Sequence, residues 1–131
     1  MESPLVSVTI NTFNRYKILK KCIESVLSQD YSCIELLVLD NCSSDDTRKY
    51  LLTLKDRINI VYVDYPEPNA MKTLNNLFMS ATGKYILVLD DDAFMPDTTT
   101  ITKFVTTMEN NPNAGIVAAN ILDLNLSLIH I

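Results

Sequence analysis

Short apolar runs rich in β-branched residues alternate along this chain with longer segments in which apolar residues recur at helical spacing. In one such segment Ile18, Cys22 and Val26 form a single row, with a second apolar row beside it. The pattern predicts strands at residues 5–11, 34–40, 58–63 and 85–90, with a fifth near 115–121. It predicts helices at residues 15–29, from Ser43 or Ser44 onward, at 70–82, and through Ile101, Phe104, Val105 and Met108.

This alternation of strand and helix predicts an α/β, Rossmann-like fold with a mostly parallel sheet and helices on both faces. The run at 85–90 is almost continuously apolar, as a strand covered on both faces should be. Asn14 is the expected N-cap of the first helix, and Gly83 stands where the third helix should stop. Ligands bind such sheets at the carboxyl ends of the strands, so we expect functional residues just after Ile10, Leu39 and Leu89.

The length and net charge of the chain argue against several classes of function. The chain has 131 residues, a size typical of one domain, and its net charge of −5 argues against a nucleic-acid partner. No apolar run approaches the ~20 residues of a spanning helix, and no signal peptide is visible, so the default location is cytoplasmic. Cys22, Cys33 and Cys42 are odd in number and form no CxxC pair, which indicates neither a disulfide framework nor a zinc site.

The strongest chemical feature is the triplet Asp90, Asp91 and Asp92 after the fourth predicted strand. Adjacent carboxylates repel one another, and a hard divalent cation with oxygen ligands would relieve that repulsion. Mg²⁺ or Mn²⁺ takes one or two protein carboxylates and completes its shell with water and phosphate oxygens. The alternative is an exposed acidic turn without a ligand.

Polar residues also follow the first two predicted strands. Asp40 and Asn41 could hydrogen-bond a base or ribose, although capping of the next helix is the competing interpretation. The loop at residues 11–15 has no glycine, so it is neither a GxGxxG fingerprint nor a P-loop, and Arg15 is its candidate phosphate partner. Lys72, one turn inside the third helix, could reach a phosphate or be a solvated surface lysine.

Together these stretches resemble the family-2 glycosyltransferases with a GT-A fold. VSVTINTFNR resembles that family's first strand and turn, IELLVLDNCSSDDT its second strand and acidic loop, and NAMKTLNNLFMSATGKYILVLDDD its helix leading to the DxD motif. The resemblance implies that Asp92 and Asp90 hold Mg²⁺ or Mn²⁺ against a diphosphate. It implies nucleotide-sugar contacts for Thr12, Asn14, Arg15, Asp40, Asn41, Ser43, Asn69, Lys72, Asp90 and Asp91.

The sequence departs from the family pattern in four places. Asn11 replaces a usual proline, Cys42 a usual glycine, Ala70 stands where a glycine is frequent, and Ala93 occupies the place of a frequent fourth acid. If the backbone at position 42 needs a positive φ, cysteine is strained there.

The resemblance implies inverting transfer of a sugar from a nucleotide-diphosphate sugar, UDP-linked in our expectation, to a saccharide or lipid acceptor. It leaves peripheral association with the cytoplasmic face of the membrane open. Inversion needs a general base, which the family places well after the DxD motif, and we expect it beyond the chain end. We therefore expect residues 1–125 to be a donor domain incomplete at its C-terminus and unable to complete a transfer. Residues 126–131, LSLIHI, look like a non-native adapter-derived tail.

Two other classes share clustered acids on an α/β sheet. A nucleotidyltransferase that forms an activated sugar usually needs a glycine-rich, basic loop after strand one, which residues 11–15 do not provide. A phospho-acceptor receiver domain places paired acids after strand one, whereas the cluster here follows the fourth predicted strand.

Overall fold

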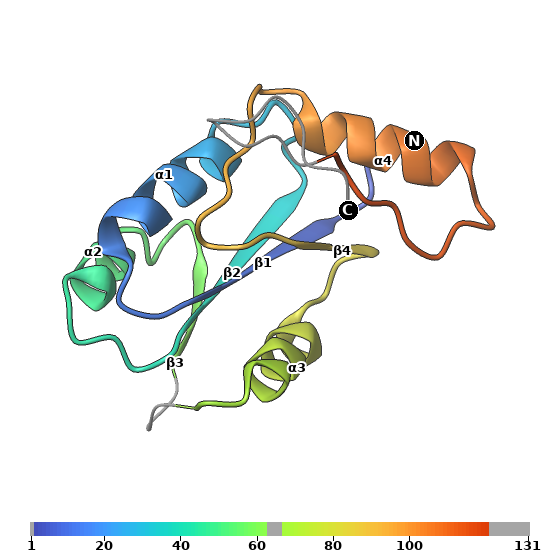
Figure 1. Ribbon diagram of the computed structural model, residues 1–131. Helices are drawn as coiled ribbons and strands as arrows, with labels where there is room; N and C mark the ends of the chain where they lie inside the picture. The colour runs from blue at the N-terminus through green and yellow to red at the C-terminus, as the bar shows by residue number, and fades with distance from the viewer. Residues whose placement is uncertain (1, 63–66, 121–131) are drawn as a thin grey trace.

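The computed structural model describes residues 2–62 and 67–120 and shows a parallel sheet flanked by helices (Figure 1). The strands run in the order β3-β2-β1-β4, and every pairing between them is parallel. The predicted α/β fold class is thus confirmed. The elements, in chain order, are β1 Val6–Thr12, α1 Tyr16–Leu27, β2 Ile34–Asp40, α2 Thr47–Thr53, β3 Asn59–Tyr62, α3 Ala70–Ser80, β4 Tyr85–Val88 and α4 Thr100–Asn110.

The register aligns the carboxyl ends of the central strands. Thr12, the last residue of β1, lies opposite Asp40, the last residue of β2. On the other side of β1, Thr9 lies opposite Val88, the last residue of β4. The loops that follow these three strands therefore begin at the same edge of the sheet.

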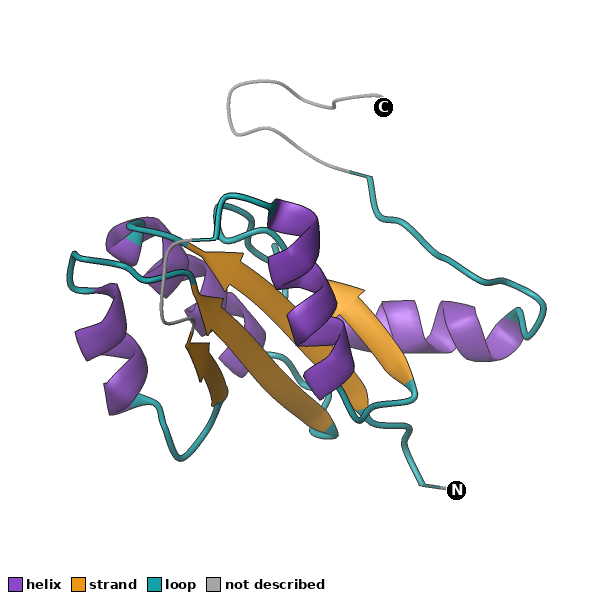
Figure 2. Cartoon of the chain, turned by 90° about the horizontal axis from the view of Figure 1, so that it is seen from below, coloured by secondary structure: helices purple, strands orange, loops and turns teal. Residues whose placement is uncertain are grey.

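Helices cover both faces of the sheet, as predicted, but unequally. Helices α1 and α4 lie over one face, and α3 lies alone over the other, in front of the strands in Figure 2. The first face carries the larger core, in which Val8, Ile10 and Val38 of the strands pack with buried residues of α1, α2 and α4. The core under α3 is small: Leu37 and Leu39 of β2 pack with Leu77 of α3, and Val61 joins them.

Polar contacts complete the α3 side of β1. Asn11 Nδ2 donates a hydrogen bond of 2.6 Å to Thr73 Oγ1 of α3. Ser7 Oγ donates to the Glu35 carboxylate and accepts a bond of 2.8 Å from the Gly83 amide. Glu35 also accepts from the amide and hydroxyl of Thr82, so this carboxylate fixes the α3–β4 connection against the amino end of the sheet.

The predicted fifth strand is wrong within the described residues. Residues 111–120 contain no strand, and Ile116 is 88% exposed. The β-branched run there has strand propensity, but a strand forms only by pairing, and in the described residues this segment pairs with none. Strand β4 also stops at Val88, earlier than predicted.

The predicted start of the second helix and the predicted cap of the first are wrong too. Helix α2 begins at Thr47, several residues after Ser43 and Ser44. Arg15 holds the N-cap position of α1, where no side chain caps the helix. Asn14 instead binds the loop after β2, whose contacts also delay the start of α2.

In the part of the chain that the structure describes, no helix has the length and apolar character needed to cross a bilayer. The tail at 126–131 and the domain end at residue 125 lie outside the described residues, so both stay predictions.

Candidate functional site at the carboxyl edge of the sheet

The structure brings the acid triplet to the loop that follows β1. Asp91 turns inward: it is 8% exposed, and its Oδ2 accepts a hydrogen bond of 2.9 Å from Thr12 Oγ1. Its Oδ1 accepts a bond of 3.0 Å from Arg15 Nη1. The buried negative charge of Asp91 is therefore compensated by a guanidinium and a hydroxyl from the neighbouring strand end.

Asp90 and Asp92, on either side, face solvent. Arg15 Nη1 lies 3.5 Å from Asp92 Oδ2, so this arginine is shared between the buried acid and one exposed acid. Two exposed carboxylates with a buried one between them are free to take a cation from the solvent side.

A buried cysteine lies behind the triplet. Cys22 of α1 donates through Sγ to the backbone oxygen of Asp90 at 3.5 Å. Burial, and then the negative charges of Asp91, Asp92 and Asp90, raise the pKa of this thiol to about 12. Cys22 is therefore a neutral packing group at neutral pH, not a nucleophile or a metal ligand.

Asp40 is a buried carboxylate, and one of its two oxygens accepts no hydrogen bond among the described residues. The residue is 0% exposed, and its Oδ1 accepts a 3.0 Å bond from the Ser43 amide. Its Oδ2 has no hydrogen-bond donor among the described residues, and Arg48 Nε lies 3.7 Å away. Oδ2 is ion-paired with Arg48 but accepts no hydrogen bond among the described residues, so it is a candidate acceptor for a ligand donor.

Asn14 ties the loop after β1 to the loop after β2. Its Oδ1 accepts from the amides of Ser44, at 2.7 Å, and Asp45, at 3.3 Å, while its own amide donates to Ser43 Oγ at 3.0 Å. Asn14 adopts φ 50° and Cys42 adopts φ 60°, both in the left-handed region. Asparagine tolerates this region well, whereas cysteine at position 42 carries the strain anticipated from its replacement of glycine.

Asn41 makes a second tie between loops. Its amide nitrogen donates to the Glu67 backbone oxygen at 2.9 Å, and its oxygen accepts from the Glu67 amide at 2.8 Å. Glu67 then accepts from the Asn69 amide and pairs with Lys72 Nζ at 3.0 Å. Asn69 caps α3 by accepting from the amides of residues 71 and 72.

The predicted site residues thus fall into two groups. Those that connect separate loops are Thr12, Asn14, Asn41, Ser43 and Asp91, whereas Asn69 caps α3. Arg15, Lys72, Asp90 and Asp92 are exposed, and Asp40 is buried with an Oδ2 that accepts no hydrogen bond among the described residues.

Two residues of this edge escaped the sequence interpretation. Phe13, between Thr12 and Asn14, is 48% exposed and presents an aromatic ring on a polar loop. Its position just past the end of an apolar strand was the available signal. Glu67 anchors the Asn41 and Lys72 contacts, and no local pattern marks it.

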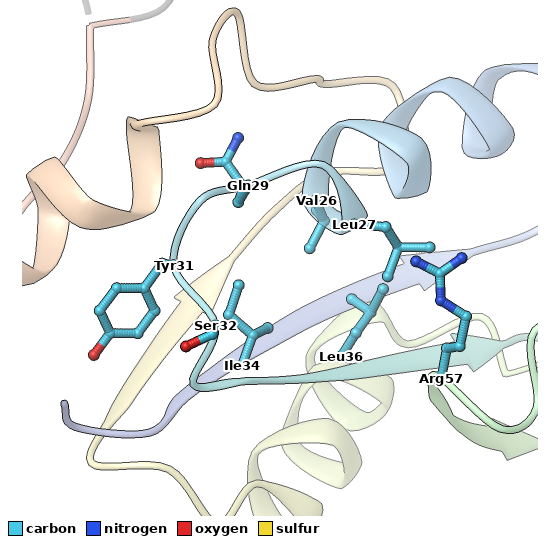
Figure 3. Close-up of a pocket in the computed structure, with 8 residues that line it drawn as sticks. All are labelled: Val26, Leu27, Gln29, Tyr31, Ser32, Ile34, Leu36 and Arg57. Carbon is cyan, nitrogen blue, oxygen red and sulfur yellow. The ribbon is translucent and has the colours of Figure 1, made fainter. Parts of the chain in front are cut away.

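Pockets lie elsewhere. A cavity of about 210 Å³ sits at the opposite, amino end of β2, between the end of α1 and Arg57 (Figure 3). A second, of about 340 Å³, lies beside the outer edge of β4 and under α4. Neither is lined by the acid triplet or by Asp40.

Residues 7–123 match the model of a protein family described as Glycosyl transferase family 2. The chain is 40% identical over 94 residues to a GalNAc(5)-diNAcBac-PP-undecaprenol β-1,3-glucosyltransferase of Campylobacter jejuni. It is 37% identical over 93 residues to WfgD of Escherichia coli, a UDP-Glc:α-D-GlcNAc-diphosphoundecaprenol β-1,3-glucosyltransferase. These matches cover 68% and 70% of this chain but 30% and 36% of the relatives, so the chain spans about a third of their length.

Solved structures give the same fold. The mannosyltransferase PcManGT from Pyrobaculum calidifontis, in complex with GDP-Man and Mn²⁺, superposes with a TM-score of 0.73 at 25% identity. The alignment covers 82% of this chain and 33% of that one. S. aureus TarS 1–349 in complex with UDP-GlcNAc superposes with a TM-score of 0.76 at 20% identity, over 82% of this chain and 32% of that one.

Proposed function

Because this chain belongs to glycosyl transferase family 2, we propose that its sheet edge is the donor site of a glycosyltransferase. The donor is a nucleotide-diphosphate sugar, UDP-linked, and the sugar passes with inversion to a saccharide or lipid acceptor. One observation carries the proposal: buried Asp40, whose Oδ2 accepts no hydrogen bond among the described residues, ends β2 at the same edge of the sheet where the loop with the exposed pair Asp90 and Asp92 begins.

Asp40 supports recognition of the base. A uracil ring presents an imide N–H that can donate to an acceptor, and Asp40 Oδ2 is an acceptor in need of a donor. At the corresponding ring position cytosine and adenine have a bare nitrogen, whereas guanine also carries an N–H, so titration with GDP separates the two bases. Phe13 offers a flat apolar face on the adjoining loop, which suits stacking against a base.

Asp90 and Asp92 fit a hard cation by their chemistry, because Mg²⁺ and Mn²⁺ bind carboxylate oxygens. In the described ranges no three His, Cys, Asp or Glu side chains are grouped to hold a metal without help. That suits an ion whose shell is completed by substrate phosphate oxygens. When bound, such an ion would neutralise charge on the departing diphosphate.

The cationic side chains would assist at the same phosphates. Arg15 is 49% exposed and already aligned with the acid loop, and Lys72 lies one turn inside α3 with its side chain 66% exposed. Each can pair with phosphate oxygens, Arg15 by a planar fork and Lys72 as a point charge. The individual contacts predicted for Thr12, Asn14, Asn41, Ser43 and Asn69 are part of this proposal, whereas Asp91, which already binds Thr12 and Arg15, acts on the donor through those residues.

The acceptor side of the proposal rests on the relatives. Two of them are named for transfer to undecaprenol diphosphate-linked saccharides. We propose an acceptor of that lipid-linked class, met by a cytoplasmic protein associated peripherally with the membrane face. No residue of the described ranges is assigned as the general base.

Calorimetric titration with UDP, with and without Mn²⁺, tests the proposal. We expect UDP to bind more tightly with Mn²⁺, Asp92→Ala to remove the Mn²⁺ effect, and Asp40→Asn to weaken UDP at any Mn²⁺ concentration. Asp56→Asn, at an exposed turn after α2, controls for net charge. Parallel titrations with GDP and dTDP identify the base.

Other outcomes would reject it. UDP binding that is indifferent to both Mn²⁺ and Asp92→Ala would remove the metal site. Phosphorylation of Asp90 by a small phosphodonor would favour a receiver domain. Release of diphosphate from a nucleoside triphosphate and a sugar phosphate would favour a nucleotidyltransferase.

A further inference from the structure

The middle acid of the triplet differs from its neighbours in burial and in contacts. Asp91 is buried, whereas Asp90 and Asp92 are exposed. We propose that Asp91 is not a metal ligand but a positioning residue, which fixes Arg15 and the end of β1 against the acid loop. The inference rests on the proposed donor site. It assigns different roles to three carboxylates that are adjacent in sequence.

The hydrogen bonds of Asp91 account for both of its oxygens. Oδ2 accepts from Thr12 Oγ1 at 2.9 Å, and Oδ1 accepts from Arg15 Nη1 at 3.0 Å. A cation held by Asp91 would have to reach an almost fully buried carboxylate and lie beside the positive guanidinium of Arg15. Asp90 and Asp92 meet solvent without that cost, so a cation binds them first.

The contact with Thr12 links the two halves of the donor site. Thr12 lies opposite Asp40 in the sheet register, and the backbone oxygen of Thr12 accepts from the Asn41 amide at 2.9 Å. A short path of contacts therefore runs from Asp91 through Thr12 to the loop that carries the base acceptor. Asp91 thereby fixes the position of the phosphate-binding loop relative to the base-binding loop.

The contact with Arg15 sets the charge available to a metal. Arg15 Nη1 lies 3.0 Å from Asp91 and 3.5 Å from Asp92. While Asp91 is charged, it holds the guanidinium and leaves Asp92 only partly paired. In an Asp91→Asn variant Asp92 would be the only acid of this pair left charged, so Arg15 would compete with a cation for it.

The test measures Mn²⁺ by electron paramagnetic resonance and UDP by calorimetry, in Asp91→Asn, Thr12→Val, the double variant and Asp92→Asn. We expect Asp91→Asn to bind Mn²⁺–UDP on the order of 10-fold more weakly, the usual loss for a group that orients a metal ligand. The spectrum of the bound Mn²⁺ should match the wild type. Thr12→Val should weaken UDP as well, and the double variant should be no weaker than Asp91→Asn. Thr12→Ser, which keeps the hydroxyl, should restore affinity.

Several results would overturn the inference. A changed Mn²⁺ spectrum in Asp91→Asn, with loss as complete as in Asp92→Asn, would make Asp91 a ligand. Losses that multiply in the double variant would show that Thr12 and Asp91 act independently. Unchanged affinity in both single variants would remove the positioning role while leaving the donor site intact. If the wild-type protein bound neither Mn²⁺ nor UDP, the proposed donor site itself would be rejected.

Discussion

Gly83, between α3 and β4, has no room for a side chain. A Cβ placed on it would lie 2.7 Å from Ser7 Oγ, 2.8 Å from the Leu5 backbone oxygen and 2.8 Å from the Ser7 amide nitrogen. Two of these three neighbours are backbone atoms at the start of β1. They can move only if the central strand moves between its partners, so a substitution at this glycine acts on the whole sheet.

The size of the effect follows from those contacts. Overpacking of a well-packed site costs about 1–3 kcal/mol. The 2.8 Å bond from the Gly83 amide to Ser7 Oγ would also be lost or bent, at a cost of about 0.5–1.5 kcal/mol. We therefore expect Gly83→Ala to lower the free energy of unfolding by about 2–4 kcal/mol, a large share of the roughly 5–15 kcal/mol typical of a domain.

Urea unfolding followed by circular dichroism measures this loss, and Gly115→Ala is the matched control. A Cβ at Gly115 meets no atom of residues 2–62 or 67–120 within 4 Å, and both variants remove one glycine, so their effects on the unfolded chain cancel. With m of about 2 kcal/mol/M, the midpoint of Gly83→Ala should fall by about 1–2 M relative to Gly115→Ala. Equal midpoints would refute the steric reasoning.

Three further predictions concern the backbone at Cys42, the reactivity of the cysteines and the pH dependence of stability. Cys42→Gly should raise the unfolding free energy by about 0.5–1 kcal/mol, because it relieves the φ of 60°, whereas Cys42→Ala should leave it unchanged. A thiol reagent at pH 8 should modify Cys42 in the folded protein and spare Cys22, whose pKa is about 12; equal rates would contradict its burial. For Glu35, burial alone would raise the pKa, but the hydrogen bonds from Ser7 and Thr82 outweigh it and lower the pKa below 4.5. Its stabilisation is thus complete above pH 4.5 and lost as the pH falls through the folded-state pKa, so Glu35→Gln should flatten the acid limb of a stability–pH curve.

The sequence predicts the fold well where the signal is local. The apolar run of β2 is confirmed residue for residue at Ile34–Asp40, because a strand in the middle of the sheet is apolar along its length. The fifth strand fails because pairing is not local: Ile116 is as β-branched as its counterparts in β1 but has no partner among the described residues.

The residues of the site could be predicted from the sequence, but the separate role of each carboxylate could not. The sequence places Asp90, Asp91 and Asp92 after a strand, yet it cannot say which carboxylate turns inward, since that depends on Thr12 and Arg15 from a distant strand end. Asn14 illustrates the same limit. Its residue type suits a helix cap, but the loop after β2 offers it amides in a geometry that no sequence spacing reveals.

The unequal covering of the sheet has a consequence for how the molecule opens. Helix α3 packs on the sheet through a small apolar cluster around Leu77 and a hydrogen bond between Asn11 and Thr73, whereas α1 and α4 share the large core. Elements with few buried apolar contacts open at lower free energy than the whole domain. Amide hydrogens of α3 should therefore exchange with deuterium earlier than those of α1. Since Asn69 is the N-cap of α3 and Lys72 lies in its first turn, a nucleotide that contacts these residues would slow that exchange, so donor binding could be followed as protection of this one helix.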